Sequence, residues 1–182
     1  MTPTPTGTPE PCQPYFPPGE PNIGAPNGVF ATLGCGTYIV LDLVAMGYSP
    51  IDTTNPDPNN DLVFYERETP SDPGNIAFDW VSVQIGDGPS GDCASGNWTT
   101  VLNWGDGDPT NNGHLGGSYP ENDNQLVPFG DLIGPPGLQT GIGIDLDSFI
   151  PNGTYSCIRI NSPFNWPDND GSEVDALEIL NP

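Results

Sequence analysis

Lysine is absent from this 182-residue sequence, and the other basic residues are nearly absent. The sequence has two arginines, Arg67 and Arg159, and one histidine, His114, but 24 acidic residues. With the histidine neutral, the formal net charge is −22. A chain without a basic patch repels phosphate backbones and anionic lipid headgroups, which argues against nucleic-acid and membrane-surface binding. No apolar run approaches the roughly 20 residues of a membrane-spanning helix, so no membrane insertion is expected. The lack of lysine also excludes Schiff-base catalysis.

Catalytic motifs are scarce as well. His114 lies in a loop rich in glycine and asparagine, without a GxSxG motif around it, so a Ser-His-Asp triad is not supported. A carboxylate pair for glycoside hydrolysis stays open, because such a pair is defined by distance in space. We expect a protein that is not an enzyme.

Turn-forming residues are abundant, since glycine and proline together make up 48 of the 182 residues. A disordered chain is the alternative, but the 17 aromatic residues and several apolar alternations of period two indicate short strands between turns. The expected strands are residues 29–33, 38–43, 61–66, 76–85, 98–104, 141–147, 155–160 and 173–180. The sequence therefore predicts an all-β fold, a β-sandwich of jelly-roll type with about eight antiparallel strands and long loops rich in Asx, Gly and Pro.

The first residues have a different composition. Residues 1–11 contain the repeat TPTPTGTPEP, which is typical of an extended Thr/Pro linker. We expect this linker to join a single β-sandwich domain, residues 12–182, to other domains of the same chain. The domain itself is expected to be a monomer.

The sequence contains four cysteines: Cys12, Cys35, Cys93 and Cys157. A zinc site is not supported, because no two of them have CxxC spacing and the sequence has one histidine that could serve as a further ligand. Two disulfides in an oxidising compartment are the better interpretation, so we expect an extracellular protein, secreted or on the cell surface. Three connectivities are possible, and the sequence does not choose among them. The pairing Cys12–Cys35 with Cys93–Cys157 is the one we favour.

Acidic residues gather in three loops in which Asp, Asn or hydroxyl side chains occupy alternate positions. Calcium takes six to eight oxygen ligands, and short loops of this kind supply them. Asx side chains also cap ordinary turns without any metal, which is the alternative. The candidate Ca²⁺ ligands in these loops are Asp57, Asp61, Asp106, Asp108, Asp168, Asp170 and Asp175.

Aromatic residues beside amides suggest a second kind of site. Sugar recognition combines an aromatic face with hydrogen bonds from amides and carboxylates. The candidate ligand-binding residues are Trp104, Trp166, Tyr119, Asn111 and Asn112, and the expected partner is a polysaccharide or glycan. Packing of these rings in the core is the alternative, and it is favoured for Trp80 and Trp98, which lie inside expected strands.

The motifs DLVFYE, WVSVQIGDG, WTTVLNW, GIGIDLD, YSCIRI and DGSEVDALEIL resemble, taken together, galactose-binding-like jelly rolls. This class includes discoidin-like domains and carbohydrate-binding modules of bacterial surface or secreted multidomain proteins. The resemblance implies a structural calcium near the terminal strands, with Glu66 and Asp175, and more weakly Asp61, as ligands. The sugar-binding positions of that class do not map onto particular residues here. Mainly from the loops rich in aromatic and amide side chains, we expect a non-catalytic extracellular binding module, calcium-stabilised and carbohydrate-binding. The alternative is a structural or adhesive surface domain, a calcium-stapled spacer with no small ligand.

Overall fold

The computed structural model describes residues 22–34, 36–67, 74–135, 139–163 and 171–180. These residues form thirteen strands and five short 3₁₀ helices. Within this described part, no helix has the length and apolar character needed to cross a membrane. The linker expected at residues 1–11 lies outside the described residues.

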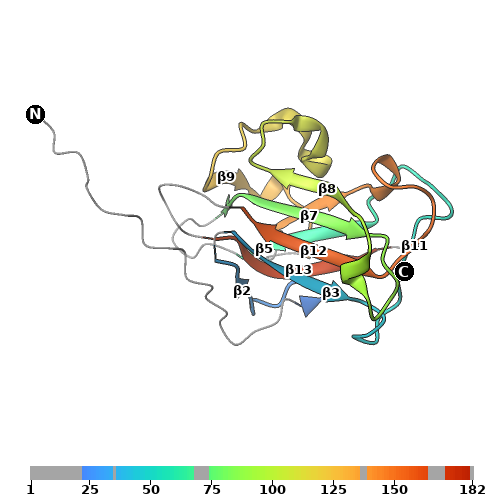
Figure 1. Cartoon of the computed structure of the whole chain (residues 1–182). Helices are drawn as coiled ribbons and strands as arrows, with labels where there is room; N and C mark the ends of the chain where they lie inside the picture. The colour runs from blue at the N-terminus through green and yellow to red at the C-terminus, as the bar shows by residue number, and fades with distance from the viewer. Residues whose placement is uncertain (1–21, 35, 68–73, 136–138, 164–170, 181–182) are drawn as a thin grey trace, which may run out of the picture.

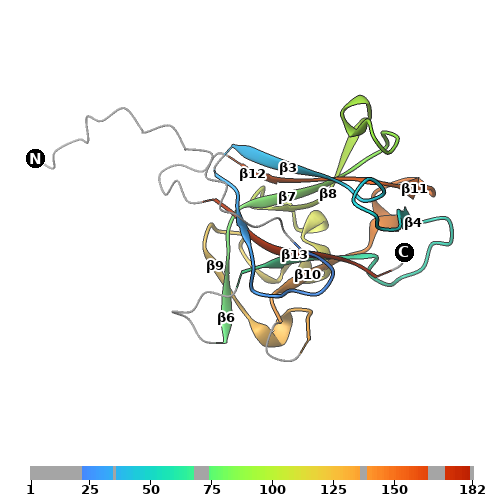
Figure 2. The same ribbon diagram turned by 90° about the horizontal axis from the view of Figure 1, so that it is seen from below.

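Two main sheets pack face to face (Figures 1 and 2). One has the order β1 (Asn22–Ile23), β13 (Glu173–Ile179), β5 (Leu62–Glu66) and β10 (Gly141–Ile144), with β2 (Ala31–Thr32) also paired to β13. The other has the order β3 (Thr37–Asp42), β12 (Cys157–Ser162), β7 (Val81–Gly86) and β8 (Trp98–Trp104). Neighbouring strands are antiparallel, except that β1 runs parallel to β13.

Two short ribbons and the 3₁₀ helices complete the structure. The ribbons pair β4 (Ile51–Asp52) with β11 (Thr154–Tyr155), and β6 (Asn75–Phe78) with β9 (Gln125–Pro128). The helices are η1 (Cys93–Ser95), η2 (Pro109–Asn111), η3 (Gly113–Ser118), η4 (Phe129–Asp131) and η5 (Leu146–Ser148). The expected all-β sandwich is confirmed, whereas the jelly-roll connectivity stays a prediction. The single strand expected at residues 76–85 is instead two strands, β6 and β7, in different sheets.

The core lies between the two main sheets and follows the alternation of the sequence. On β7, Val81, Val83 and Ile85 are buried, and on β12 so are Ile158 and Ile160. Burying each such side chain contributes about 1.5–3 kcal/mol relative to leaving it in water. The period-two pattern therefore sets which face of each strand turns inward.

A β-bulge between β7 and β8 reverses the expected roles of two tryptophans. Val83 pairs with Leu102 and the next residue, Gln84, pairs with Thr100, so β8 carries one extra residue. Because this residue shifts the alternation, Trp104 is fully buried and Trp98 is half-buried against the outer side of the sheet. The predictions of a core Trp98 and a ligand-binding Trp104 are therefore wrong.

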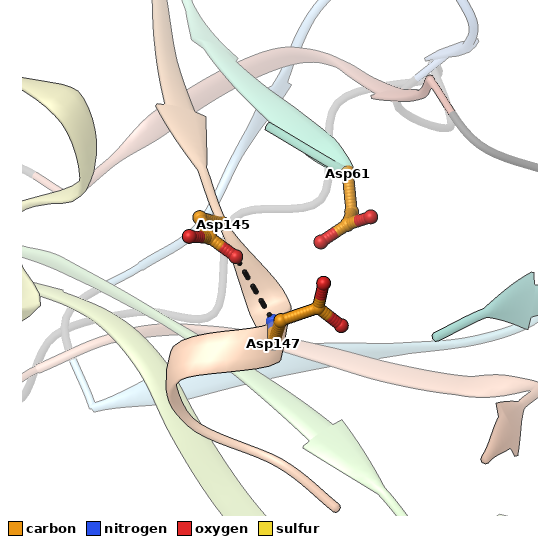
Figure 3. Close-up of side chains that lie close together, drawn as sticks. All are labelled: Asp61, Asp145 and Asp147. Atoms are coloured by element: carbon orange, nitrogen blue, oxygen red, sulfur yellow. Dashed lines mark hydrogen bonds between the residues drawn. The ribbon is translucent and has the colours of Figure 1, made fainter. Parts of the chain in front are cut away.

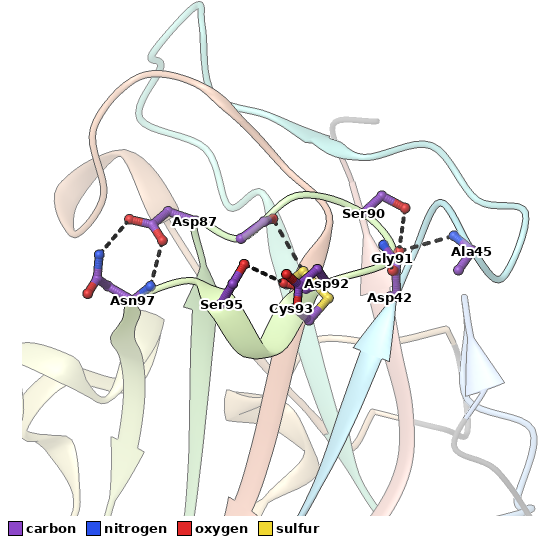
Figure 4. Close-up of a disulfide and its surroundings, with 11 residues drawn as sticks. Asp42, Ala45, Asp87, Ser90, Gly91, Asp92, Cys93, Ser95 and Asn97 are labelled. Carbon is purple, nitrogen blue, oxygen red and sulfur yellow. Dashed lines mark hydrogen bonds between the residues drawn. A yellow bond between two sulfur atoms is a disulfide. The ribbon is translucent and has the colours of Figure 1, made fainter.

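The disulfide Cys93–Cys157 ties the β7–β8 loop to β12, as we expected (Figure 4). Asp42, at the end of β3, holds the same loop, since its carboxylate accepts hydrogen bonds from Ser90 Oγ at 2.9 Å and from Gly91 N–H. These bonds, led by that from Gly91, lower the pKa of Asp42. Cys12 and Cys35 lie outside the described residues.

Candidate functional site

Three aspartates meet at one end of the first main sheet (Figure 3). Ile144 is opposite Leu62 in the last residue pair of β10 and β5. Asp61 comes directly before β5 and Asp145 directly after β10, so the antiparallel register brings them face to face. Helix η5 then turns the chain, which adds Asp147 to the group. Carboxylate oxygens of the three residues lie within 4.8 Å of one another.

Backbone N–H groups fix the orientation of these carboxylates. Asp61 Oδ2 accepts from Leu146 N at 2.8 Å, and Asp145 Oδ1 accepts from Asp147 N at 3.1 Å. Asp147 Oδ2 accepts from Asp57 N at 2.7 Å, which connects the 55–61 loop to the group. The cluster is therefore held by its own loops before any ligand binds.

Both arginines bond to residues outside this cluster in the described part of the chain. Arg67 forms an ion pair with Glu173 at 3.0 Å, and Arg159 donates to Gln84 at 2.7 Å. Asp61 is only 4% exposed, and the buried Oδ1 of Asp147 has no hydrogen-bond partner in the described part of the chain. Close carboxylates repel one another unless a proton or a cation is shared between them.

A divalent cation fits this arrangement. Oxygens bound to one Ca²⁺ at about 2.4 Å can lie no more than about 4.8 Å apart, which the three carboxylates satisfy. The unpaired Oδ1 of Asp147 supplies an oxygen without breaking a hydrogen bond. Of the three aspartates, Asp145 also lines an open pocket of about 230 Å³. The pocket is lined by Asn60, Thr110, Gly113, His114, Asp145, Ser148 and Phe149.

Of the expected calcium ligands that lie in the described residues, only Asp61 belongs to this cluster, and Asp57 adjoins it through its backbone. Asp106 and Asp108 instead stabilise their own loop. Asp106 Oδ1 accepts from Asp108 N at 2.8 Å, and Asp108 Oδ1 accepts from Thr110 N at 3.0 Å. These contacts match the turn-capping alternative, although they do not test for a metal. Asp168 and Asp170 lie outside the described residues.

Glu66 and Asp175, the ligands implied by the resemblance, are not part of this cluster, and they have different hydrogen-bond partners. Glu66 is 1% exposed and accepts from Glu173 N at 2.6 Å. Burial, and then the nearby charge of Asp79, raises the pKa of Glu66 well above its ordinary value. Asp175 lies at a bulge of β13 and accepts from the backbone N–H of Gly28, at 3.0 Å to Oδ2.

Asp145 and Asp147 were missed as candidates, although the sequence contains a usable signal. The segment DLD at 145–147 has the same alternate spacing as the loops that were selected. It follows the strand motif GIGI, and for this reason we assigned it to a strand rather than to a loop.

The expected sugar-binding residues do not assemble into one exposed surface. Trp104 is fully buried, as is Asn112, whose amide donates to Glu121 Oε1 at 2.6 Å. A fully buried side chain offers no face to a glycan, so these two assignments are corrected. Tyr119 donates its hydroxyl to Asp131, and Asn111 donates to Asp106 at 3.0 Å. Trp166 lies outside the described residues.

Comparison of the chain with protein-family models, with curated proteins and with solved structures finds no match. The class of protein is therefore defined by the fold and the site: a disulfide-linked β-sandwich with a three-aspartate cluster that can hold a metal ion. The resemblance to galactose-binding-like modules stays a prediction.

Proposed function

We propose that this chain is a non-catalytic extracellular binding module stabilised by Ca²⁺ at Asp61, Asp145 and Asp147. One observation carries the proposal: three carboxylates lie within 4.8 Å of one another, and neither arginine is directed to them. A bound dication would offset their repulsion and connect β5, β10 and η5.

The ligand types favour calcium over other metals. Each of the three ligands is a carboxylate, whereas zinc and copper prefer histidine or cysteine. Loops of this kind adapt to the irregular coordination of Ca²⁺ more readily than to the strict octahedron of Mg²⁺. The Cys93–Cys157 disulfide supports an extracellular location. Calcium sites of extracellular modules have dissociation constants of about 10⁻⁴–10⁻³ M, so a weak site would be sufficient there.

Thermal unfolding with and without calcium tests the site. At a hundredfold excess over Kd, a ligand of the native state adds about 2.7 kcal/mol, which is about 5–11 °C in Tm for a domain of this size. We expect this increase for the wild-type protein and its loss in Asp145→Asn.

Asp108→Asn is the matched control, because it makes the same chemical change at an expected calcium ligand outside the cluster. It should keep the response to calcium. A calcium response that survives in Asp145→Asn and disappears in Asp108→Asn would place the ion in the 106–110 loop. No response in the wild-type protein would reject calcium stabilisation altogether.

Glycan binding is the second part of the proposed function. The structural spacer, which is the alternative function, has the same cation site but binds no sugar. Glycan-binding measurements therefore separate the two functions, and calcium measurements do not. The surface on which a glycan would bind must carry exposed aromatic rings and polar groups that are already oriented.

A further inference from the structure

The outer face of the β3–β12–β7–β8 sheet carries an ordered row of polar side chains. Gln84 lies at its centre, with its amide nitrogen donating to Thr100 Oγ1 at 3.0 Å. Its amide oxygen accepts from Arg159 Nε at 2.7 Å and from Asn161 Nδ2 at 3.1 Å. These contacts join β8, β7 and β12, so the polar groups are held in place by three strands.

The guanidinium of Arg159 lies over two aromatic rings on this face. Its guanidinium carbon lies 4.5 Å from the ring centroid of Trp98 and 5.6 Å from that of Tyr38. Tyr38 is 57% exposed, and Trp98 is half-buried. Together, the rings and Gln84 fix the guanidinium, so little side-chain entropy is left for a ligand to remove.

Arg67 forms an ion pair with Glu173. Among the described residues, no carboxylate pairs with Arg159 in this way. Only Nε of Arg159 is used in the described part of the chain, which leaves both Nη nitrogens for a bidentate contact with a carboxylate.

The face is also poor in acid, in a chain whose net charge is −22. Between Tyr38 on β3 and Asn103 on β8, the side chains that alternate with the buried ones are aromatic, aliphatic, amide, hydroxyl or guanidinium groups. Asp42, at the far end of β3, is the exception, and its carboxylate is bound by Ser90 and Gly91. Apart from Asp42, the one charged side chain on this stretch of the four strands is therefore that of Arg159.

We propose that this face binds a glycan carrying a uronic acid, with the sugar carboxylate on the Nη nitrogens of Arg159. The inference deepens the proposed glycan binding and depends on it. The flanking rings of Tyr38 and Trp98 offer C–H contacts to sugar rings, while Thr100 and Asn161 offer hydrogen bonds to hydroxyls.

The charge of the chain limits the ligand to one with few acidic groups. A polyanion would be repelled by the other acidic residues over about one Debye length, roughly 8 Å at physiological ionic strength. One carboxylate on Arg159 gains a charge-assisted pair and carries only a small part of this cost. Short or sparsely charged uronate glycans therefore bind better than dense polyuronates.

Isothermal titration calorimetry with three probes tests the proposal: oligogalacturonate, a glucuronic-acid-substituted xylan oligosaccharide and an alginate oligosaccharide. Each is compared with its methyl ester, which removes the charge and keeps the sugar ring. We expect at least one of the three uronate oligosaccharides to bind. The dissociation constant of its methyl ester should be about 10-fold higher or more, which is the effect of losing a charged hydrogen bond. Arg159→Gln should weaken binding of the uronate probe by the same factor and leave binding of its methyl ester unchanged.

Tyr38→Ala should weaken both acid and ester, whereas Tyr48→Ala, which truncates another exposed tyrosine outside this face, should weaken neither. Circular dichroism confirms that each variant is folded. No binding of any probe, equal binding of acid and ester, or full binding by Arg159→Gln would overturn the proposal.

The measurements are made in calcium and in EDTA, at a temperature at which the protein is folded in both. The aspartate cluster belongs to the other main sheet. Glycan binding that persists in Asp145→Asn, without a calcium effect on Tm, would reject only the calcium site. A calcium effect without uronate binding would reject only this inference.

Discussion

Replacing Glu66 by glutamine should make the protein more stable at neutral pH. The side chain is 1% exposed, and burial together with Asp79 raises the pKa of Glu66 well above its usual range. The Glu173 N–H donates to Oε1 at 2.6 Å, and glutamine keeps an oxygen that can accept this bond. The substitution therefore removes a charge that the core disfavours and preserves the shape of the site.

The effect has a defined dependence on pH. Because the pKa is higher in the folded than in the unfolded chain, the stabilisation from Glu66 is complete below the unfolded pKa, about 4.3. As the pH rises from there to the folded pKa, the unfolded chain releases the proton first, and the free energy of unfolding falls by about 1.4 kcal/mol per pH unit. Glu66→Gln lacks this loss, so the two proteins are similar near pH 4 and diverge at higher pH.

Thermal or urea unfolding from pH 4 to pH 8, at fixed calcium, measures the divergence. A loss that extends over one pH unit corresponds to about 1.4 kcal/mol, or about 3–6 °C in Tm. Glu178→Gln removes one negative charge from a half-buried position and so separates the effect of net charge from that of burial. A Glu66→Gln protein that is less stable at pH 7, with an unchanged pH slope, would refute the reasoning.

Two further predictions concern the covalent and backbone constraints. The Cys93–Cys157 disulfide closes a loop with a sequence separation of 64 residues. Replacing both cysteines by alanine should therefore lower the free energy of unfolding by about 4 kcal/mol, relative to the wild-type protein under non-reducing conditions. An unchanged denaturation midpoint would contradict this. Gly113→Ala should cost at least about 2 kcal/mol, because φ is +57° and the new Cβ would lie 2.3 Å from Gly143 O. Gly130→Ala, with no atom within 4 Å of the new Cβ, is its control and should change stability little.

Much of the fold is predictable from the sequence, because buried and more exposed residues alternate along strands such as β7 and β12. Val81, Val83 and Ile85 are buried as their spacing indicates. The spacing does not reveal where a β-bulge reverses the alternation within a strand. Trp98 and Trp104 are six residues apart and would share a face in a regular strand, but the β-bulge turns them to opposite sides.

The candidate site is less predictable, since proximity depends on how the strands pair. Asp61 was recognised from its loop, but its neighbour Asp145 lies 84 positions later in the sequence. The register in which Ile144 pairs with Leu62 decides that these two aspartates meet. The partners of Glu66 and Asp175 depend on the register of β13 in the same way.

The parallel pairing of β1 with β13 has a mechanical consequence. Ile23 lies opposite Leu177, and Gly24 N donates to Leu177 O at 2.9 Å. Tension that pulls the chain outward before β1 and after β13 draws these two strands in opposite directions along their own axes. Their hydrogen bonds are then sheared together instead of being opened one after another, so the short β1 strand resists force more than its length suggests.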